Sequence, residues 1–292
     1  MNPGSARIRT IVKAMATGEP AQARAGSVRA LALALVAGLP LFVSAWVGRR
    51  SPGPAFHHYA DARGFFGLPH ALDVLSNLAF VAAAAAGAVW VWRARDPLLR
   101  GLGALLAIAV AIIGVGSALY HRAPDDATLV LDWIPIAVAM TWLLALLLAD
   151  RVDRRLGIAA AVLLPLGAAA TVLTWYAGGG TSGGDMRWYG LVQIEGLLLV
   201  PAILLAYPRG ALRSGDLWAA VGCFLLMRLL HAHDGAILAA TGVSGHSLKH
   251  VVAAVATYLA LRSLRGSAYV AQNSASCSAF SARRGPSSAI LS

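Results

Sequence analysis

Charged residues are scarce in this chain. Of its 292 residues, only 13% are Asp, Glu, Lys or Arg, whereas 58% are hydrophobic, and the mean hydropathy is +0.68. A soluble globular domain carries about 25% charged residues. The low charge content therefore argues against a soluble domain and indicates an integral membrane protein.

Cysteine is nearly absent. The chain has two cysteines, Cys223 inside an apolar segment and Cys277 near the C-terminus. Such a pair offers neither a disulfide framework nor a redox motif. Any chemistry must therefore depend on other residue types.

The chain is instead rich in long apolar segments. A run of about 20 apolar residues can cross a bilayer as a helix. Eight such spans are predicted, at approximately 28–47, 71–92, 101–121, 128–150, 156–176, 188–207, 216–236 and 245–263. We therefore expect an all-α membrane protein with a polytopic helix bundle.

The first span has a second interpretation, as a signal peptide. Its apolar run exceeds the usual 7–15 residues of a signal-peptide core, and no small-residue cleavage site is evident before Arg49. An uncleaved anchor is therefore favoured. The tails, 1–27 and 265–292, are rich in polar and small residues, which predicts disorder.

The distribution of basic residues predicts the orientation. With a cytoplasmic N-terminus, the cytoplasmic loops and tails hold 17 of the 24 Lys and Arg residues, and the opposite side holds Arg49, Arg50, Arg63, Arg122 and Arg187. Cytoplasmic loops carry an excess of Lys and Arg, so both termini are expected in the cytoplasm. This also explains the net charge of +11 without a nucleic-acid partner.

Polar side chains gather at the ends of five spans. They are His70, Asp73, Ser117, His121, Asp132, His231, His233, Asp234, His246 and His250. Under the predicted topology, all of these ends are non-cytoplasmic. Ionisable groups at membrane depth are costly and are functional candidates by default, so we expect a site near this face.

Three histidines suggest a metal ion. His246 and His250 are spaced i, i+4 and share one helix face, with room for one metal ion. With His121 they would supply the three ligands of a catalytic zinc site, with Ser117 and Asp132 nearby. Simpler roles stay open: interfacial histidines, a helix-capping or first-turn Asp132, and a packing Ser117.

A polar stripe lies on the second span. Asp73, Ser76 and Asn77 are spaced i, i+3, i+4 within an apolar segment. Buried polar groups need partners. These residues would either hold ligand histidines in one tautomer or pack helices together.

Short motifs around these residues resemble a known family. Gly114–His121 is similar to GxGSxxFH, with Tyr120 in place of Phe, and Leu131–Pro135 is similar to LDExP, with Trp133 in place of Glu. Ser76-Asn77-Leu78 matches SNL. Together they resemble the alkaline ceramidases, part of a superfamily of seven-helix membrane hydrolases (CREST) that includes progestin/adiponectin-receptor-like proteins.

The resemblance implies a domain organisation. It covers about 57–264, which would form the seven-helix ceramidase-like domain, and 28–47 would then be an added N-terminal anchor. The sequence of this domain resembles bacterial ceramidase-domain proteins in particular, and this resemblance implies a location in a bacterial inner membrane.

The resemblance also implies a zinc-dependent hydrolase of ceramide-like lipids. His121, His246 and His250 would hold zinc with a water in the fourth position. Asp132 would take the proton of that water, and Ser117 would help to stabilise the oxyanion at the amide carbonyl. Candidates for supporting or substrate-contacting roles are Asp73, Ser76, Asn77 and Asp234, the last resembling the family's aspartate in the penultimate helix.

The chain departs from the family at two places. The animal enzymes have a calcium site where this chain has His57–Arg63 and His70. Only Asp61 and Asp73 are left there as acids, so no calcium site is expected. Lys249 lies between two proposed ligands and would either snorkel to the surface or meet a lipid headgroup.

The favoured hypothesis is a zinc-dependent membrane amidase that cleaves the N-acyl bond of a ceramide-like lipid and releases a fatty acid. The alternative is a lipid receptor or sensor of the same fold, with structural zinc and a fourth protein ligand such as Asp132. A transporter would need polar residues that continue to the cytoplasmic side, and the sequence lacks them. The expected partners are the lipid substrate and the bilayer, with no oligomeric state indicated.

Overall fold

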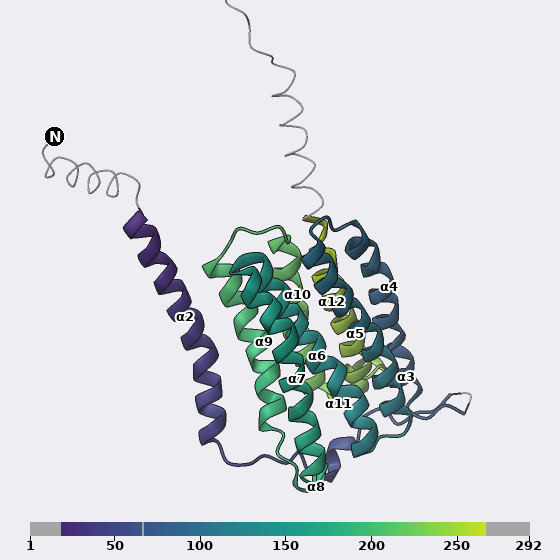
Figure 1. The fold of residues 1–292 in the computed structure, drawn as a ribbon. Coiled ribbons are helices and arrows are strands. Elements are labelled where there is room, and N and C mark those ends of the chain that lie inside the picture. Colours follow the sequence, from purple (N-terminus) through teal and green to yellow (C-terminus); the bar gives the residue numbers. More distant parts are fainter. Residues whose placement is uncertain (1–18, 66, 267–292) are drawn as a thin grey trace, which may run out of the picture.

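The protein is a bundle of long helices that run up and down alongside one another (Figure 1). The computed structural model describes residues 19–65 and 67–266, and no strand forms within these ranges. Seven helical segments there are long and apolar enough to cross a membrane: Gly26–Trp46, Ala71–Arg93, Pro97–Arg122, Asp126–Arg151, Arg154–Ala177, Arg187–Ala206 and Ser214–Ala232. The predicted all-α membrane architecture is confirmed.

The elements follow one another in a simple order. They are α2 (Glu19–Trp46), η1 (Pro54–His57), α3 (Ala71–Ser76), α4 (Leu78–Arg93), α5 (Pro97–Arg122), α6 (Asp126–Arg151), α7 (Arg154–Ala177), α8 (Gly180–Gly183), α9 (Arg187–Ala206), α10 (Ser214–Ala232), α11 (Asp234–Thr241) and α12 (Gly245–Arg262). The short helices α3, α8 and α11 lie at one end of the bundle, which is the lower end in Figure 1. We call this the metal end, because His121, His246 and His250, the predicted metal ligands, lie there.

The eighth predicted span corresponds to α12. This helix packs against α4 and α10 within the bundle, as the other core helices do. It is less apolar than the seven spans above because its first turns carry His246, Lys249 and His250. The 18 residues of α12 run along the bundle, with the three polar residues at the metal end.

Two predicted spans are interrupted. The segment 71–92 consists of α3 and α4, which meet at Asn77, where the side chains of Ser76 and Asn77 both donate to the carbonyl of Asp73 and compete with its backbone bond. The segment 216–236 ends at Ala232. His233 leaves the helical conformation there, and Asp234 begins α11.

The first helix is longer than predicted. It begins at Glu19, so residues 19–27 of the expected disordered tail are helical. This stretch is rich in alanine, the best helix former, and Pro20 stands near the start, where its missing N–H costs little. The remaining tail residues, 1–18 and 267–292, lie outside the described part.

Helix α2 is an addition to the side of the bundle. It packs along α9, and side chains such as Leu31, Leu35 and Leu39 are more than 60% exposed, as expected for a lipid-facing helix. At its C-terminal end, the guanidinium of Arg187 donates to the carbonyls of Ser44 and Val47. These bonds tie the end of α2 to the start of α9.

Side-chain caps fix the starts of the core helices. Asp96 accepts bonds from the backbone of Leu98 and Leu99 at the start of α5, and Asp125 forms a capping box with Thr128 at the start of α6. Because Asp125 caps α6, Asp132 lies almost two turns inside that helix. The capping role for Asp132 is therefore excluded.

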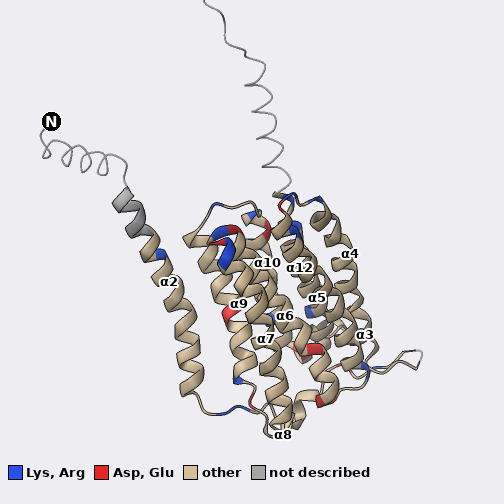
Figure 2. Ribbon diagram, in the orientation of Figure 1, with Lys and Arg blue, Asp and Glu red and all other residues tan. Residues whose placement is uncertain are grey.

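Basic residues concentrate at the end of the bundle opposite the metal end (Figure 2). There Arg262 and Arg265 both donate to Asp216, and Arg151 bonds to Asp150 and to the carbonyls of Tyr207 and Leu212. These pairs satisfy the charges where the helices end. The helices between the two ends are almost wholly uncharged.

Glycine at position 116 sets the distance between α5 and α6. A Cβ atom at Gly116 would press on the backbone carbonyl of Leu131. Only a residue without a side chain permits this approach, and it brings Ser117 of α5 next to Asp132 of α6. The close packing by small residues is typical of membrane helices.

We predict that Gly116→Ala lowers the free energy of unfolding by about 1–3 kcal/mol, because a backbone carbonyl cannot move aside without shifting α6. Thermal unfolding of the detergent-solubilised protein measures this change. Gly101→Ala on the same helix is the matched control, since a Cβ atom there meets nothing within 4 Å. Equal stability of the two variants would contradict the assignment of Gly116 as the contact point.

Candidate metal centre

Three buried histidines from two helices meet at the metal end of the bundle. His121 comes from the last turns of α5, and His246 and His250 come from the first turns of α12. One nitrogen of each lies within 4.8 Å of the other two, and Nε2 of His121 is 3.1 Å from Nε2 of His246. All three side chains are at most 5% exposed.

The spacing of these nitrogens fits a metal ion. Two nitrogens bound at about 2.0–2.1 Å in tetrahedral geometry lie about 3.3 Å apart, close to the separation of His121 and His246. Imidazole nitrogens suit zinc and several other transition metals, so the donor set allows zinc without excluding the others. The prediction of a metal site is confirmed to this extent, that a buried group capable of holding an ion is present.

Ser76 holds His250 in one orientation. Its hydroxyl donates to the carbonyl of Asp73 at 3.0 Å, and its oxygen lies 2.8 Å from Nδ1 of His250. The oxygen can therefore accept from an Nδ1–H group, which leaves Nε2 of His250 with its lone pair free for a metal. Of the two roles open for Ser76, contact with a ligand histidine is the one that the geometry favours.

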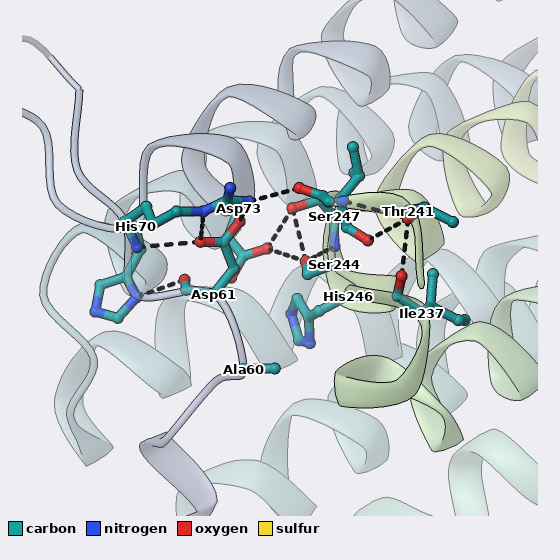
Figure 3. A network of polar contacts seen from close by, with 12 residues as sticks. Ala60, Asp61, His70, Asp73, Ile237, Thr241, Ser244, His246 and Ser247 are labelled. Carbon is teal, nitrogen blue, oxygen red and sulfur yellow. Dashed lines mark hydrogen bonds and ion pairs between the residues drawn. The ribbon is translucent and has the colours of Figure 1, made fainter. Parts of the chain in front are cut away.

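Asp73 fastens the start of α12 to α3 (Figure 3). Its carboxylate accepts from the hydroxyls of Ser247 at 2.6 Å and Ser244 at 3.2 Å, while Ser244 also caps α12 by accepting from the backbone of Ser247. Asn77 is fully buried and donates to the Asp73 carbonyl. Asp73 and Asn77 thus serve helix packing, and they position the histidines indirectly.

Asp234 fixes the same helix from another side. One carboxylate oxygen accepts from the backbone N–H of His246 at 2.9 Å, and the other accepts from the backbone N–H of Ala60 at 3.3 Å. The contact joins α11, α12 and the segment after η1, as the neighbouring positions of Ala60 and His246 in Figure 3 illustrate. Asp234 therefore positions a ligand through its backbone.

Ser117 and Asp132 lie side by side across the α5–α6 contact. Asp132 is 8% exposed and Ser117 is 2% exposed, and both residues line the same cavity. Oδ1 of Asp132 has no partner among the described residues. Asp132 is thus a buried carboxylate with one free oxygen in the cavity that contains the histidines.

Tyr59 belongs to the site, although its position in the sequence gave no sign of this. Its ring centroid lies 4.7 Å from that of His121 and 4.2 Å from that of His246. Its hydroxyl donates to the hydroxyl of Tyr120 at 2.7 Å. Burial, together with Tyr120 beside it, raises the pKa of Tyr59 above its usual value, so the phenol stays protonated.

A chain of hydrogen bonds continues from Tyr120 away from the histidines. The Tyr120 hydroxyl lies 3.1 Å from Nδ1 of His57, and Nε2 of His57 lies 3.0 Å from Asp126. Tyr120 therefore supplies the hydroxyl that joins η1 to the start of α6. Tyr59 and His57 could be found only from the structure, because they lie about 60 residues before their partners.

Other predicted residues stay outside the cluster. His233 is exposed and bonds to the carbonyl of Leu229 on its own helix. His70 stands before α3 and contacts the carbonyl of Asp61. The Asp61 carboxylate pairs with Arg63 at 2.7 Å, and these bonds lower the pKa of Asp61. Because Arg63 occupies it, Asp61 gives no support to a calcium site.

A cavity of about 820 Å³ opens onto the histidines and runs along the bundle. Its wall on α12 reaches from His246 to Ala260, fourteen residues further along. A helix rises 1.5 Å per residue, so the cavity is roughly 21 Å long. Away from the metal end, apolar residues dominate the wall, including Leu106, Leu143, Val200 and Leu217.

Lys249 faces this cavity. The side chain lines the wall between His246 and His250, and Arg228 of α10 lines it one turn before His231. The structure therefore favours a role for Lys249 inside the bundle over the predicted alternative of snorkelling to the surface. His231 also belongs to the wall, and its ring lies 5.3 Å from that of His246.

Comparison of the chain with known protein families, with characterised proteins and with solved structures finds no match.

Proposed function

We propose that this protein is a zinc-dependent membrane hydrolase that cleaves the N-acyl amide bond of a ceramide-like lipid and releases a fatty acid. The observation that carries the proposal is the cavity. Its polar end contains the three histidines that could hold a metal ion, and the rest of its length, which we call the shaft, is mainly apolar. One molecule with a polar amide and a long acyl chain would fill both parts.

The dimensions of the shaft suit a single acyl chain. Its length of roughly 21 Å is about two thirds of the hydrocarbon thickness of a bilayer. Burying methylene groups there contributes about 0.8 kcal/mol each. A bound chain would thus be held firmly, with its amide group beside the three histidines.

The ligand set favours an enzyme over a sensor. Among the described residues, the metal-competent group contains three histidines and no fourth His, Cys, Asp or Glu. Structural zinc sites are almost always closed by four protein ligands, whereas catalytic sites keep one position open. The lipid receptor or sensor, with Asp132 as fourth ligand, is therefore the second candidate.

His121, His246 and His250 would hold the zinc ion. Bound zinc would supply Lewis acidity, which makes water a stronger nucleophile and polarises the amide carbonyl. The protein would contribute a dry cavity and fixed ligand orientations, the latter through Ser76 and Asp234.

Asp132 would carry the proton. Its free Oδ1 could accept the proton of the attacking water and then deliver it to the leaving nitrogen, which must be protonated before the C–N bond breaks. The Ser117 hydroxyl lies beside Asp132 and lines the same cavity. Once Asp132 holds the proton, this hydroxyl could donate its hydrogen to the oxyanion, so the two residues would act in sequence.

The proposal includes an orientation in the membrane. Basic residues concentrate at the end opposite the histidines, and this end would face the cytoplasm. The metal end would then lie near the non-cytoplasmic face of a bacterial inner membrane, where lipid headgroups can reach it.

We predict that His246→Ala/His250→Ala removes both bound zinc and lipid amide hydrolysis. Two of three ligands are lost, so zinc content should fall from about one per chain to a background level. Metal analysis of the detergent-purified protein and fatty-acid release from ceramide, followed on the same samples, measure the two effects. His233→Ala is the matched control, because this histidine is exposed and outside the cluster.

The outcomes separate the candidates. Zinc without hydrolysis of any lipid amide would favour the sensor. A wild-type protein free of zinc after purification without chelators would contradict the metal assignment itself.

Asp132→Asn is expected to lower kcat by about 10²–10⁴-fold while zinc stays bound, because the side-chain amide of asparagine cannot accept the proton of the attacking water. Turnover and zinc content must be measured together. Loss of zinc in this variant would instead identify Asp132 as a ligand, and unchanged kcat would exclude it as the base.

Ser76→Ala should weaken zinc binding by about 10–100-fold, since His250 loses the partner that orients its ring. Competition with a chromogenic zinc chelator measures the affinity. Thr174→Ala serves as the hydroxyl control, because Thr174 is exposed and bonds only to carbonyls of its own helix. Equal affinities in the two variants would leave Ser76 with a packing role only.

A further inference from the structure

We propose that Lys249 and Arg228 form a subsite for an acidic group on the amine side of the substrate, so that N-acyl amino acids are better substrates than neutral lipid amides such as ceramide. This inference rests on the hydrolase function proposed above and names its substrate class. Two cations line the cavity wall, and neither has a role in the metal site described above.

Both cations lie at the metal end of the cavity. Lys249 precedes His250 on α12, and Arg228 lies three residues before His231 on α10, a neighbouring helix. Both helices border the same cavity there. A ligand group beside the histidines would therefore come within reach of both side chains.

Neither cation has a partner within the described part of the chain. No hydrogen bond and no ion pair within 4 Å involves Lys249 or Arg228, whereas Arg151, Arg187 and Arg262 are all paired at the ends of the bundle. Charges at membrane depth are expensive and usually paired. Two unpaired cations that face one cavity point to a ligand that supplies the counter-charge.

The nearby acids bond mainly to other groups. Asp234 accepts two backbone N–H groups, and Oδ1 of Asp73 accepts the hydroxyls of Ser244 and Ser247. Asp132, Asp73 and Asp234 all attract Lys249, but none forms an ion pair with it. The cavity wall therefore holds two cations and two carboxylates, those of Asp132 and Asp234. A bound zinc ion would add two positive charges, so the zinc-loaded cavity favours an anion.

The position of the cations decides which part of the substrate is acidic. The acyl chain needs the apolar shaft, so it must leave the metal end along α12 towards Ala260. Lys249 and Arg228 lie at the other end of that path, beside the amide. The acidic group therefore belongs to the amine fragment, close to the amide nitrogen, as the carboxylate of an amino acid is.

The reaction is then a simple hydrolysis. Water adds to the acyl carbon, one of its protons reaches the nitrogen, and the C–N bond breaks. The carboxylic acid so formed then loses the second proton of the water, which the free amine takes up. N-palmitoylglycine and water would give palmitate and glycine, with the glycine nitrogen leaving as an ammonium group. No oxidant, reductant or further reactant is needed.

The test compares two lipids of nearly equal size. N-palmitoylglycine carries a carboxylate where N-palmitoylethanolamine carries a neutral hydroxymethyl group. Zinc-loaded wild-type protein in a neutral detergent should show a kcat/KM at least 10-fold higher for the acid. Lys249→Met, which keeps the length of the side chain, and Arg228→Met should each lower this ratio by about 10-fold.

Two further variants keep the result interpretable. Lys249→Arg retains the charge and should largely restore the ratio if Lys249→Met lowers it. Arg95→Met removes an exposed cation at the opposite end of the bundle and should leave the ratio as in wild type. A ratio near one in the wild type, or a ratio that Lys249→Met does not lower, would overturn the subsite.

Thermal stabilisation by each lipid separates this inference from the function on which it rests. If no lipid amide is hydrolysed but N-palmitoylglycine stabilises wild type more than Lys249→Met, the subsite stands and the hydrolase function fails. If ceramide and N-palmitoylethanolamine are hydrolysed as well as the acid and stabilise equally, the hydrolase function stands and the subsite fails.

Discussion

The cost of burying polar groups inside an apolar bundle governs this structure. Hydrocarbon offers no hydrogen bonds, so each polar group at the metal end must find a partner in the protein or face a cavity. Most find partners: Asp73 has Ser244 and Ser247, and Asp234 has two backbone N–H groups. Several of the exceptions belong to residues that line the cavity at this end, among them Oδ1 of Asp132 and Nδ1 of His121, His231 and His246. The partnered groups fix the helices around the site, and the free Oδ1 of Asp132 is left available to a ligand.

Close helix contacts turn this chemistry into a defined geometry. Gly116 allows α6 to approach α5, and Gly245 allows the start of α12 to lie against the carbonyl of Leu230 on α10. Hydrophobic burial between helices gives little specificity in a lipid environment, so shape and a few hydrogen bonds determine which helices meet. Gly116 sets the distance between α5 and α6, and this distance in turn sets the separation of Ser117 from Asp132. A methyl group at Gly116 would change the geometry of the site without contacting the polar side chains of the site.

The sequence predicted the helices well because length and hydropathy depend on local composition. It also indicated that polar residues of α5, α6 and α12 would meet, because antiparallel spans bring alternate ends to one face. The break at Asn77 was not predictable, since it depends on side chains that compete for the carbonyl of Asp73. Tyr59 and Ser244 were missed for a related reason. Their partners lie 61 and 171 residues away, and no periodic pattern connects them. The direction of Lys249 likewise required the packing of α10 on α12, because one helix alone leaves its side chain a choice of surroundings.

Charge also limits what the cavity would accept. A wall with only apolar residues would retain any lipid, and three histidines alone would place a metal beside any polar group. Lys249, which is half-buried, and Arg228, which is exposed, would add selectivity, because a cation without an ion-pair partner discriminates between an acidic and a neutral ligand. A sensor would have little use for such a subsite next to three histidines that could hold a metal ion and a carboxylate with a free oxygen. An amidase could use all three at once, since the metal and Asp132 would act on the amide while the two cations hold the fragment that leaves.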